Sequence, residues 1–374
     1  MICDESEFPF DYFKLEEIFQ AYFDCRVNKR NTKDVIKFEG DLENNLMGLY
    51  ESLNNQTYEI GQSICFVVEE PKYREVWAGQ FRDRIVHNLI YNRIFNRFSR
   101  SFIYDSYACL PGKGTLFAVN RISKFVRSTT ENYNNTAHYL QADLKNFFVS
   151  INKEVLNNIV LERINEPILR NLVTQVIYHD PTINPNYNSS IEKFNLVPYH
   201  KSLFNSDFYH GLPIGNLTSQ FFANVYLNKL DQFVKRKLKV KCYGRYIDDL
   251  VMISQNIKYL NYCFSEMKKF AENELDVEFH PNKTIRNTTD KGINFCGQII
   301  KHHRSYIRNR TVKNMKMAFN NNCNKSPEHW KGQINSYLGM LKWCNSFNLR
   351  SNLVKDLDLG FDKDILKIKN FHLN

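Results

Sequence analysis

The pattern of apolar and polar positions divides the chain into amphipathic helices and short apolar strands. Residues 11–27 carry an apolar stripe at helical spacing, and residues 41–53 repeat leucines along one face. Residues 64–68 form a continuous apolar, partly β-branched run, which predicts a strand that ends before Pro71. Further helical patterns cover residues 85–98, a helix beginning near 115, and residues 154–178, 217–238, 258–275 and 327–347.

One stretch, residues 243–253, combines strand-forming residues with two adjacent carboxylates. Asp248 and Asp249 separate two runs of β-formers, which predicts a hairpin with the acidic pair at its turn. Side chains alternate along a strand, so the two carboxylates converge only if the chain bends between them. Convergence would concentrate negative charge, which is unfavourable unless a cation is bound. A solvated hairpin tip is the alternative interpretation.

A second apolar run, residues 138–149, predicts a core strand with Asp143 at its exit. An aromatic pair, Phe147 and Phe148, follows directly. A turn former or a helix cap would suit the position of Asp143 equally well.

Two loops stand out between these regular patterns. Residues 106–114 contain Pro-Gly and Gly-Lys-Gly, which let the backbone approach a phosphate, but the P-loop spacing is missing. Residues 211–220 open a long helix that Asn216 or Thr218 can cap. The Asn-, Pro- and Tyr-rich residues 180–207 before them predict a long insertion.

Composition narrows the class of protein. A chain of 374 residues predicts two or three subdomains. The net charge of +10 indicates a polyanionic partner, and basic residues alternate with aromatics over residues 72–84, although a solvated basic face would look the same. The acidic N-terminus and the lack of an apolar run of membrane length predict a cytoplasmic protein with no membrane partner. The nine cysteines show no Cys-x-x-Cys pair, which predicts reduced thiols and no zinc site.

Taken in chain order, the aspartate, the glycine loop and the acidic hairpin resemble the palm of reverse transcriptases. Asp143 matches the first palm motif, residues 211–220 the second and residues 246–249 the third. Lys283 matches the fourth motif and residues 295–297 the fifth. The resemblance spans roughly residues 70–345.

The resemblance implies an α+β right-hand polymerase fold, with fingers, a palm built on an antiparallel sheet and a helical thumb. The ranges that we expect are an N-terminal helical extension (1–69), fingers (70–137), palm (138–300, with the insertion 180–207), and thumb with C-terminal tail (301–374).

The implied activity is RNA-directed DNA polymerisation, in which a primer 3′-hydroxyl attacks the α-phosphate of a nucleotide. Two Mg²⁺ ions, with Mn²⁺ as a substitute, would be bound by carboxylates. The implied metal positions are Asp143, Leu144, Asp248 and Asp249. Lys283 corresponds to the lysine that protonates the leaving pyrophosphate, and a solvated surface lysine is the alternative.

The family positions for nucleotide binding lie in both halves of the chain. Arg74 and Arg84 would grip the triphosphate or, alternatively, the template backbone. Phe148 stands where the family places the side chain that collides with a ribose 2′-hydroxyl, which implies DNA synthesis. Phe147 is the alternative residue for this role, and both phenylalanines could instead be core residues. The remaining expected contacts are Ile214, Gly215 and Gln220.

Two departures indicate a branch of the family. Ile214–Gly215 stands where most members carry Gln-Gly, and Ser219–Gln220 where Ser-Pro is usual. The segment 211–220 resembles the corresponding segment of reverse transcriptases from diversity-generating retroelements. Residues 201–204 before it and residues 334–339 in the expected thumb fit the same branch. Such enzymes copy a template-repeat RNA into cDNA with errors opposite adenine, in bacteria or their phages. The implied partners are template RNA, the cDNA/RNA duplex, dNTPs and a basic oligomeric accessory protein.

Two alternatives remain from the sequence. A retron-like or antiphage-defence reverse transcriptase would share the palm motifs, although no Val-Thr-Gly thumb motif is present. A non-catalytic RNA-binding scaffold is of another class. A scaffold descended from an active enzyme would be expected to have lost one of Asp143, Asp248 and Asp249, and all three are present.

Overall fold

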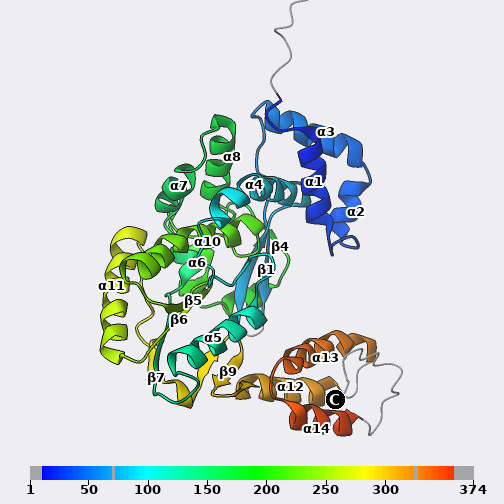
Figure 1. Ribbon diagram of the computed structural model, residues 1–374. Helices are drawn as coiled ribbons and strands as arrows, with labels where there is room; N and C mark the ends of the chain where they lie inside the picture. The colour runs from blue at the N-terminus through cyan, green and yellow to red at the C-terminus, as the bar shows by residue number, and fades with distance from the viewer. Residues whose placement is uncertain (1–10, 70–71, 323–326, 358–374) are drawn as a thin grey trace, which may run out of the picture. The chain divides into compact units, whose positions relative to one another are not determined.

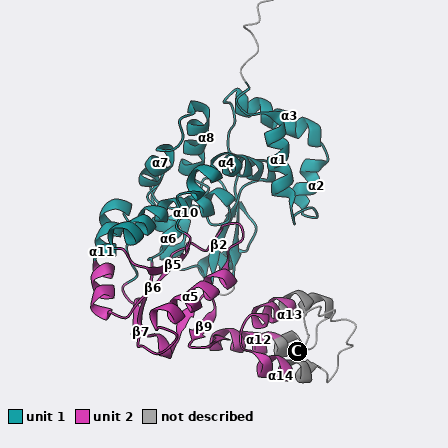
Figure 2. Ribbon diagram, viewed as in Figure 1, with its two compact units in different colours: residues 1–103, 144–238, 266–280 teal, residues 104–143, 239–265, 281–374 magenta. Residues whose placement is uncertain are grey.

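The computed structural model describes residues 11–69, 72–322 and 327–357 (Figure 1). Residues 1–10 and 358–374, at the ends of the predicted extension and tail, lie outside the described residues. The chain forms two compact units, each assembled from three separate stretches (Figure 2). Unit 1 comprises residues 1–103, 144–238 and 266–280, and unit 2 comprises residues 104–143, 239–265 and 281–374.

Unit 1 begins with three helices that pack around a fourth. They are α1 (Leu15–Arg26), α2 (Lys33–Glu39), α3 (Leu42–Asn54) and α4 (Phe81–Ser99). The apolar stripes read from the sequence are largely buried: Ile18 of α1 and Leu46 and Leu49 of α3 have at most 1% exposure, whereas Phe23 of α1 is 54% exposed. The two predicted N-terminal helices are therefore confirmed, and α2 between them was not predicted.

A small sheet in unit 1 joins distant parts of the chain. Its strands are β1 (Ile64–Val68), β2 (Arg74–Ala78) and β4 (Asn186–Tyr187), in the order β2-β1-β4. β2 pairs antiparallel with β1, and β4 pairs parallel with it. The basic stretch at 72–84 is thus β2 followed by the start of α4. Glu75 and Trp77 of β2 are buried.

The rest of unit 1 is helical. It contains α6 (Phe147–Ser150), α7 (Lys153–Leu161), α8 (Pro167–Tyr178), α9 (Ile191–Asn195), 3₁₀ turns at Tyr199–Lys201 and Leu203–Asn205, α10 (Leu217–Gln232) and a π-helix at Phe233–Lys237. The single helix predicted over 154–178 is wrong. Pro167 lacks an N–H and starts a new helix, where that donor is not needed. The predicted insertion is folded, and it contributes β4 to the small sheet.

The main sheet of unit 2 has four antiparallel strands. They are β3 (His138–Asp143), β5 (Cys242–Tyr246), β6 (Asp249–Ser254) and β7 (Ile285–Thr288), in the order β5-β6-β3-β7. The predicted strand before Asp143 and the predicted acidic hairpin are both confirmed. α11 (Ile257–Leu275) follows β6; it starts in unit 2 and ends in unit 1.

One face of this sheet is covered by α5 (Thr115–Thr129) together with a three-stranded meander. The meander consists of β8 (Ile293–Phe295), β9 (Gln298–Lys301) and β10 (Arg304–Ile307), preceded by a 3₁₀ turn at Thr289–Lys291. Ile122 and Phe125 of α5 share a buried core with Tyr139, Val251 and Phe295. The α+β class with an antiparallel palm-type sheet is therefore confirmed.

Three helices end the described chain. They are α12 (Asn309–Asn322), α13 (Pro327–Lys342) and α14 (Phe347–Leu357). The predicted helical C-terminal region is confirmed, but the single helix predicted over 327–347 is wrong, because α13 ends at Lys342 and α14 begins only at Phe347. Among the described residues, no helix has both the length and the apolar character needed to cross a membrane.

Candidate active site

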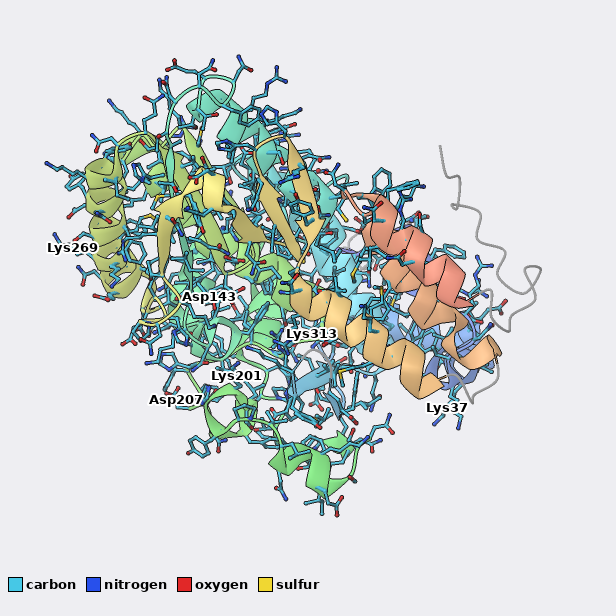
Figure 3. All side chains as sticks on the ribbon, turned by 90° about the horizontal axis from the view of Figure 1, so that it is seen from below. Lys37, Asp143, Lys201, Asp207, Lys269 and Lys313 are labelled. Atoms are coloured by element: carbon cyan, nitrogen blue, oxygen red, sulfur yellow. The ribbon has the colours of Figure 1, made fainter. Side chains whose placement is uncertain are left out.

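The acidic turn, residues 246–249, joins two paired strands of unit 2. Tyr246 pairs with Asp249, so Ile247 and Asp248 form a two-residue turn. Across the sheet, Asp143 at the end of β3 is the register partner of Asp249 (Asp143 is labelled in Figure 3). Strand pairing therefore brings the aspartates of the first and third motifs to the same end of the sheet.

Gln141 is a neighbour of these aspartates that the sequence analysis missed. Its Nε2 donates to both carboxylate oxygens of Asp249, at 3.0 and 3.3 Å, and to the carbonyl of Asn294 at 2.9 Å. The side chain is buried. The period of two along β3 puts residues 141 and 143 on one face of the sheet, and this signal could have identified Gln141.

The site carries excess negative charge. Burial raises the pKa of Asp249 to about 7; the hydrogen bond from Gln141 opposes that shift, and the charges of Asp143 and Asp248 add to it. The ammonium of Lys283 forms an ion pair with Asp143, so the lysine of the fourth motif meets the aspartate of the first. A cation beside these carboxylates would relieve the repulsion between them.

The donor set fits a hard divalent cation. Asp143, Asp248 and Asp249 offer carboxylate oxygens, which Mg²⁺ and Mn²⁺ prefer over nitrogen or sulfur. In the described part of the chain, no three His, Cys, Asp or Glu side chains already converge on one point. The side chain of Leu144 is buried and its backbone forms a bridge with Phe279, so only its carbonyl is a candidate ligand.

The 211–216 loop of unit 1 is tied to its neighbours mainly through the backbone. Leu212 donates to the carbonyl of Phe148 at 2.7 Å, and Trp77 donates to the carbonyl of Ile214 at 2.7 Å. Asn216 Oδ1 accepts from Gly79 N–H at 3.1 Å. These bonds bring Phe148, Ile214 and Gly215 together with the end of β2.

The predicted helix cap is wrong in its chemistry. Asn216 occupies the N-cap position of α10, but its side chain makes no cap bond because it accepts from Gly79 instead. The hydroxyl of Thr218 is also engaged elsewhere, 2.7 Å from His87 Nδ1. Both side chains therefore attach the start of α10 to α4 and β2.

Gly215 has no room for a side chain. A Cβ there would lie 2.4 Å from the carbonyl oxygen of Trp77 and 3.0 Å from Val76 Cγ1, and its φ is +134°. The close approach of the loop to β2 therefore requires glycine at this position.

The other predicted nucleotide-binding residues of unit 1 differ in exposure. Arg74 is exposed at the start of β2. Arg84 is half-buried, and its Nε donates to the Gly79 carbonyl at 2.7 Å, so part of its guanidinium supports the backbone. Phe148 is half-exposed whereas Phe147 is buried, which leaves Phe148 as the aromatic ring available to a ligand. Gln220 is half-exposed in the first turn of α10.

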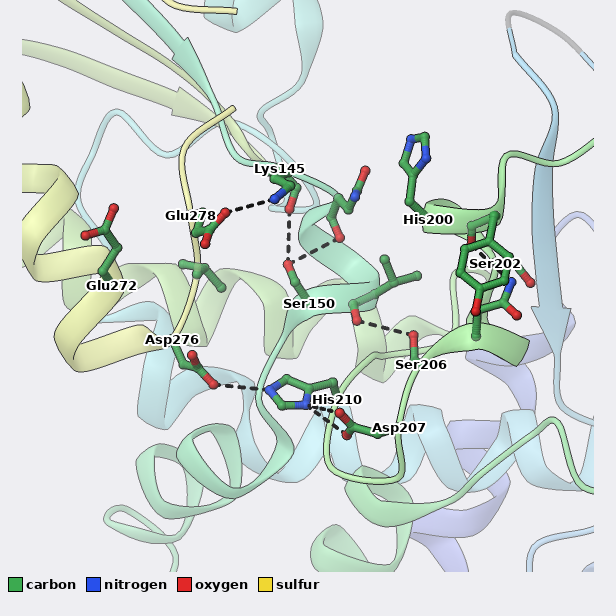
Figure 4. Close-up of a pocket in the computed structure, with 15 residues that line it drawn as sticks. Lys145, Ser150, His200, Ser202, Ser206, Asp207, His210, Glu272, Asp276 and Glu278 are labelled. Carbon is green, nitrogen blue, oxygen red and sulfur yellow. Dashed lines mark hydrogen bonds and ion pairs between the residues drawn. The ribbon is translucent and has the colours of Figure 1, made fainter. Parts of the chain in front are cut away.

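Unit 1 also contains a polar cavity of about 500 Å³ (Figure 4). It is lined by residues from 145–150, 199–210 and 272–278. Its charged groups largely pair with one another: Lys145 with Glu278 at 2.9 Å, and His210 with both Asp207 and Asp276 at 2.8 and 3.1 Å. None of the predicted site residues lines it.

Comparison with known families decides the class of protein. A family model described as "Reverse transcriptase (RNA-dependent DNA polymerase)" matches residues 69–300, more than half of the chain. The chain belongs to the reverse transcriptase family. Reverse transcriptases use divalent metal ions, which agrees with the carboxylate donors in the acidic turn and β3. The family prediction is confirmed, and the individual site residues stay predictions.

Individual relatives of this reverse transcriptase are distant. The "Putative COX1/OXI3 intron 2 protein" of Saccharomyces cerevisiae is 24% identical over 179 residues, which cover 46% of the chain and 18% of that protein. Two solved structures are telomerases, from Candida tropicalis and from Candida albicans with a telomeric RNA fragment. Both are 10% identical, with TM-scores of 0.45 and 0.48, covering 67% and 80% of this chain and 55% and 56% of theirs. The chain thus spans less than a fifth of the curated relative.

Proposed function

We propose that this reverse transcriptase is an RNA-directed DNA polymerase that extends a primer with deoxynucleotides. The observation that carries the proposal is the register of the palm-type sheet, which places Asp143 opposite Asp249 and beside the turn that holds Asp248. Family membership supports the same reaction. The template would be RNA, and the substrates would be dNTPs.

Asp143, Asp248 and Asp249 would hold two Mg²⁺ ions, for which Mn²⁺ can substitute. Bound there, the ions would activate the primer hydroxyl and stabilise the charge on the leaving pyrophosphate. Gln141 orients Asp249 by donating to both of its oxygens. Lys283, already in contact with Asp143, would supply the proton that the pyrophosphate takes up.

The test is primer extension on an RNA template in Mg²⁺, comparing wild type with Asp248→Ala. We expect the variant to lose about 10³-fold or more in rate, equivalent to about 4 kcal/mol of transition-state stabilisation. Asp290→Ala is the matched control, because Asp290 is an exposed aspartate of the same unit whose carboxylate lies 3.9 Å from Lys291 Nζ and outside the acidic turn. Absence of extension by wild type in both Mg²⁺ and Mn²⁺, or equal rates for the two variants, would contradict the proposal.

Phe148 is proposed to select deoxynucleotides. Its half-exposed ring would collide with a ribose 2′-hydroxyl, whereas the neighbouring Phe147 is buried. Phe148→Ala should therefore lower the ratio of kcat/KM for dNTP over rNTP at least about tenfold. Phe147→Leu should lower stability and leave that ratio unchanged. The opposite pattern would assign the selection to Phe147.

We further propose that the enzyme belongs to the diversity-generating branch and copies a template-repeat RNA with errors opposite adenine. The support is the sequence of the 211–220 segment, with Ile214 where an amide is usual. An amide could hydrogen-bond near the new base pair and check its geometry, and an aliphatic side chain cannot. A basic oligomeric accessory protein would be the partner in this branch.

The branch assignment is tested by sequencing the cDNA. Wild type should misincorporate mainly opposite adenine, and Ile214→Gln should reduce those errors. Errors spread evenly over the four template bases would keep the polymerase and remove the branch assignment. An unchanged error spectrum in Ile214→Gln would remove the role of Ile214 alone.

A further inference from the structure

Arg245 is a buried arginine directly behind the acidic turn. It lies in β5, one residue before Tyr246, and is only 1% exposed. Its Nη1 donates to the carbonyl of Ile247 at 2.9 Å, and its Nη2 donates to Ser106 Oγ at 3.3 Å. The carbonyl that it binds belongs to the residue just before Asp248. Burying a guanidinium is unfavourable unless its donors are used, and here one donor binds the turn and another binds Ser106.

The residue that Arg245 binds has a backbone conformation that its side chain disfavours. Ile247 has φ of +55°, in the left-handed region, and is β-branched. Such a residue persists only where the surrounding structure holds it. The bond from Nη1 to the Ile247 carbonyl is a contact of this kind.

The backbone of Arg245 is itself fixed by a segment from another part of unit 2. Arg245 N–H donates to the Asp105 carbonyl, and Tyr107 N–H donates to the Arg245 carbonyl, both at 2.9 Å. These two bonds form a parallel bridge between Ser106 and Arg245. Asp105 is held in turn by Arg121, with bonds of 2.6 and 3.0 Å. The turn is therefore supported by residues about 140 positions earlier in the chain.

The fit between this segment and β5 is tight. Tyr107 is fully buried, and its hydroxyl donates to Asp105 at 3.2 Å. A Cβ on Gly244 would lie 2.2 Å from that hydroxyl oxygen. Glycine at position 244 thus lets residues 105–107 approach β5 closely enough for Ser106 to reach Arg245.

We propose that Arg245 is a positioning residue that holds Ile247 in the left-handed conformation and so directs Asp248, with Ser106 as its support. The inference rests on the proposed function for the role of Asp248 as a metal ligand. The link between Arg245 and Ile247 can be measured without polymerisation. Ile247→Gly is the decisive partner variant, because glycine adopts this φ without help.

The experiment is a double-mutant cycle on the whole chain with two readouts. Arg245→Lys, Ile247→Gly and the double variant are compared by denaturant unfolding and by Mn²⁺ titration followed by electron paramagnetic resonance. Arg245→Lys should weaken Mn²⁺ binding about tenfold, as loss of residues that orient metal ligands does. In the Ile247→Gly background the same change should have a several-fold smaller effect on both the unfolding equilibrium constant and Mn²⁺ affinity.

Two further variants serve as a substitute test and a control. Ser106→Ala removes only the support at Nη2, and should weaken Mn²⁺ binding about two- to threefold. This variant replaces Arg245→Lys in the experiment if Arg245→Lys folds poorly. Arg170→Lys is the matched control, because the Arg170 side chain likewise donates to the backbone, at the carbonyls of Leu161 and Ile164 (2.8 and 2.7 Å). It should leave Mn²⁺ affinity unchanged and show no coupling to Ile247→Gly.

Additive effects of Arg245→Lys and Ile247→Gly on unfolding would overturn the proposal. Unchanged Mn²⁺ affinity in a folded Arg245→Lys or Ser106→Ala protein would overturn it as well. Coupling in the unfolding cycle without polymerisation by wild type would support the inference and remove the proposed function instead.

Discussion

The acidic turn of unit 2 and the 211–216 loop of unit 1 both contain a residue with positive φ, and they accommodate it in opposite ways. In the acidic turn the residue is Ile247, held from behind by the buried Arg245. The loop contains two such residues, Gly211 and Gly215, and Gly215 is pressed against the carbonyl of Trp77. The turn therefore depends on a polar contact made by a buried side chain two residues earlier in the chain, whereas the loop depends on the absence of a side chain.

The difference predicts opposite responses to mutation. Replacing the strained isoleucine with a residue that favours left-handed backbone relieves a local cost. Adding a single methyl group to the glycine creates a clash with backbone that cannot move aside. Four predictions test this contrast, from the largest expected effect to the smallest.

Gly215→Ala should have the largest effect, destabilising unit 1 by about 3 kcal/mol or more. Its Cβ would meet the Trp77 oxygen at 2.4 Å, in addition to the strain of φ at +134°. Gly112→Ala is the matched control, because Gly112 has φ of +72° and nothing within 4 Å of a built Cβ. Denaturant unfolding should show a cost of about 1 kcal/mol for the control, and equal costs for the two variants would contradict the role of packing.

The loop of unit 1 should also be sensitive to acid. His87, bonded to Thr218, has its pKa lowered to about 3, chiefly by burial and then by the charges of His179 and Arg84. A lowered histidine pKa means that the unfolded chain takes up the proton first, near pH 6.5. Stability is therefore complete above about pH 6.5 and is lost as the pH falls toward 3, by about 2 kcal/mol between pH 7 and 5.

Thermal unfolding of wild type and His87→Gln across that range measures this contribution. The variant should lose less stability on acidification, since glutamine does not titrate and can still form a hydrogen bond with Thr218. Parallel curves for the two proteins would show that the acid sensitivity arises at another group.

Gln141, beside the acidic turn, and Asn216, in the 211–216 loop, should tolerate different replacements. Gln141 donates to Asp249, whereas Asn216 accepts from Gly79 N–H. Leucine at either position leaves a buried polar group without its partner, at about 1–3 kcal/mol. Asn216→Asp keeps an acceptor and should restore most of the stability, but Gln141→Glu sets a carboxylate against Asp249 and should not. Equal behaviour of the two acidic variants in denaturant unfolding would contradict the assigned donor and acceptor roles.

Ile247→Asn should have the smallest effect, within about 1 kcal/mol of wild type and in the stabilising direction. Asparagine adopts left-handed backbone more readily than a β-branched residue, which offsets the lost apolar contact. A loss above about 2 kcal/mol in thermal unfolding would mean that the Ile247 side chain matters more than its backbone strain.

Much of this molecule could be predicted from local patterns. The strand before Asp143 and the acidic hairpin follow from runs of β-formers interrupted by charge, and the structure confirms both. Helix boundaries were less accurate, because the apolar spacing continues through 154–178 and only Pro167 marks the break. Asn216 also looked like a helix cap until its acceptor was seen to bind Gly79.

The contacts that position the site were harder to predict. Gln141 and Arg245 carry no motif of their own, and their partners lie 108 positions away in the chain (Asp249) or 139 positions away (Ser106). A sequence pattern reports which residues share a face of one element, but it does not report which element packs behind it. The assignment of residues 104–143 to unit 2 is another feature that sequence order hides.

Motif order and residue type were enough to predict the reverse transcriptase family and to nominate the carboxylates of its candidate site, because both can be read without coordinates. The packing of the folded chain was needed to show that Lys283 contacts Asp143, that Gly215 has no room for a methyl group, and that Ser106 supports Arg245. These are distances between segments far apart in the chain. They depend on strand register and close packing, which no local pattern encodes.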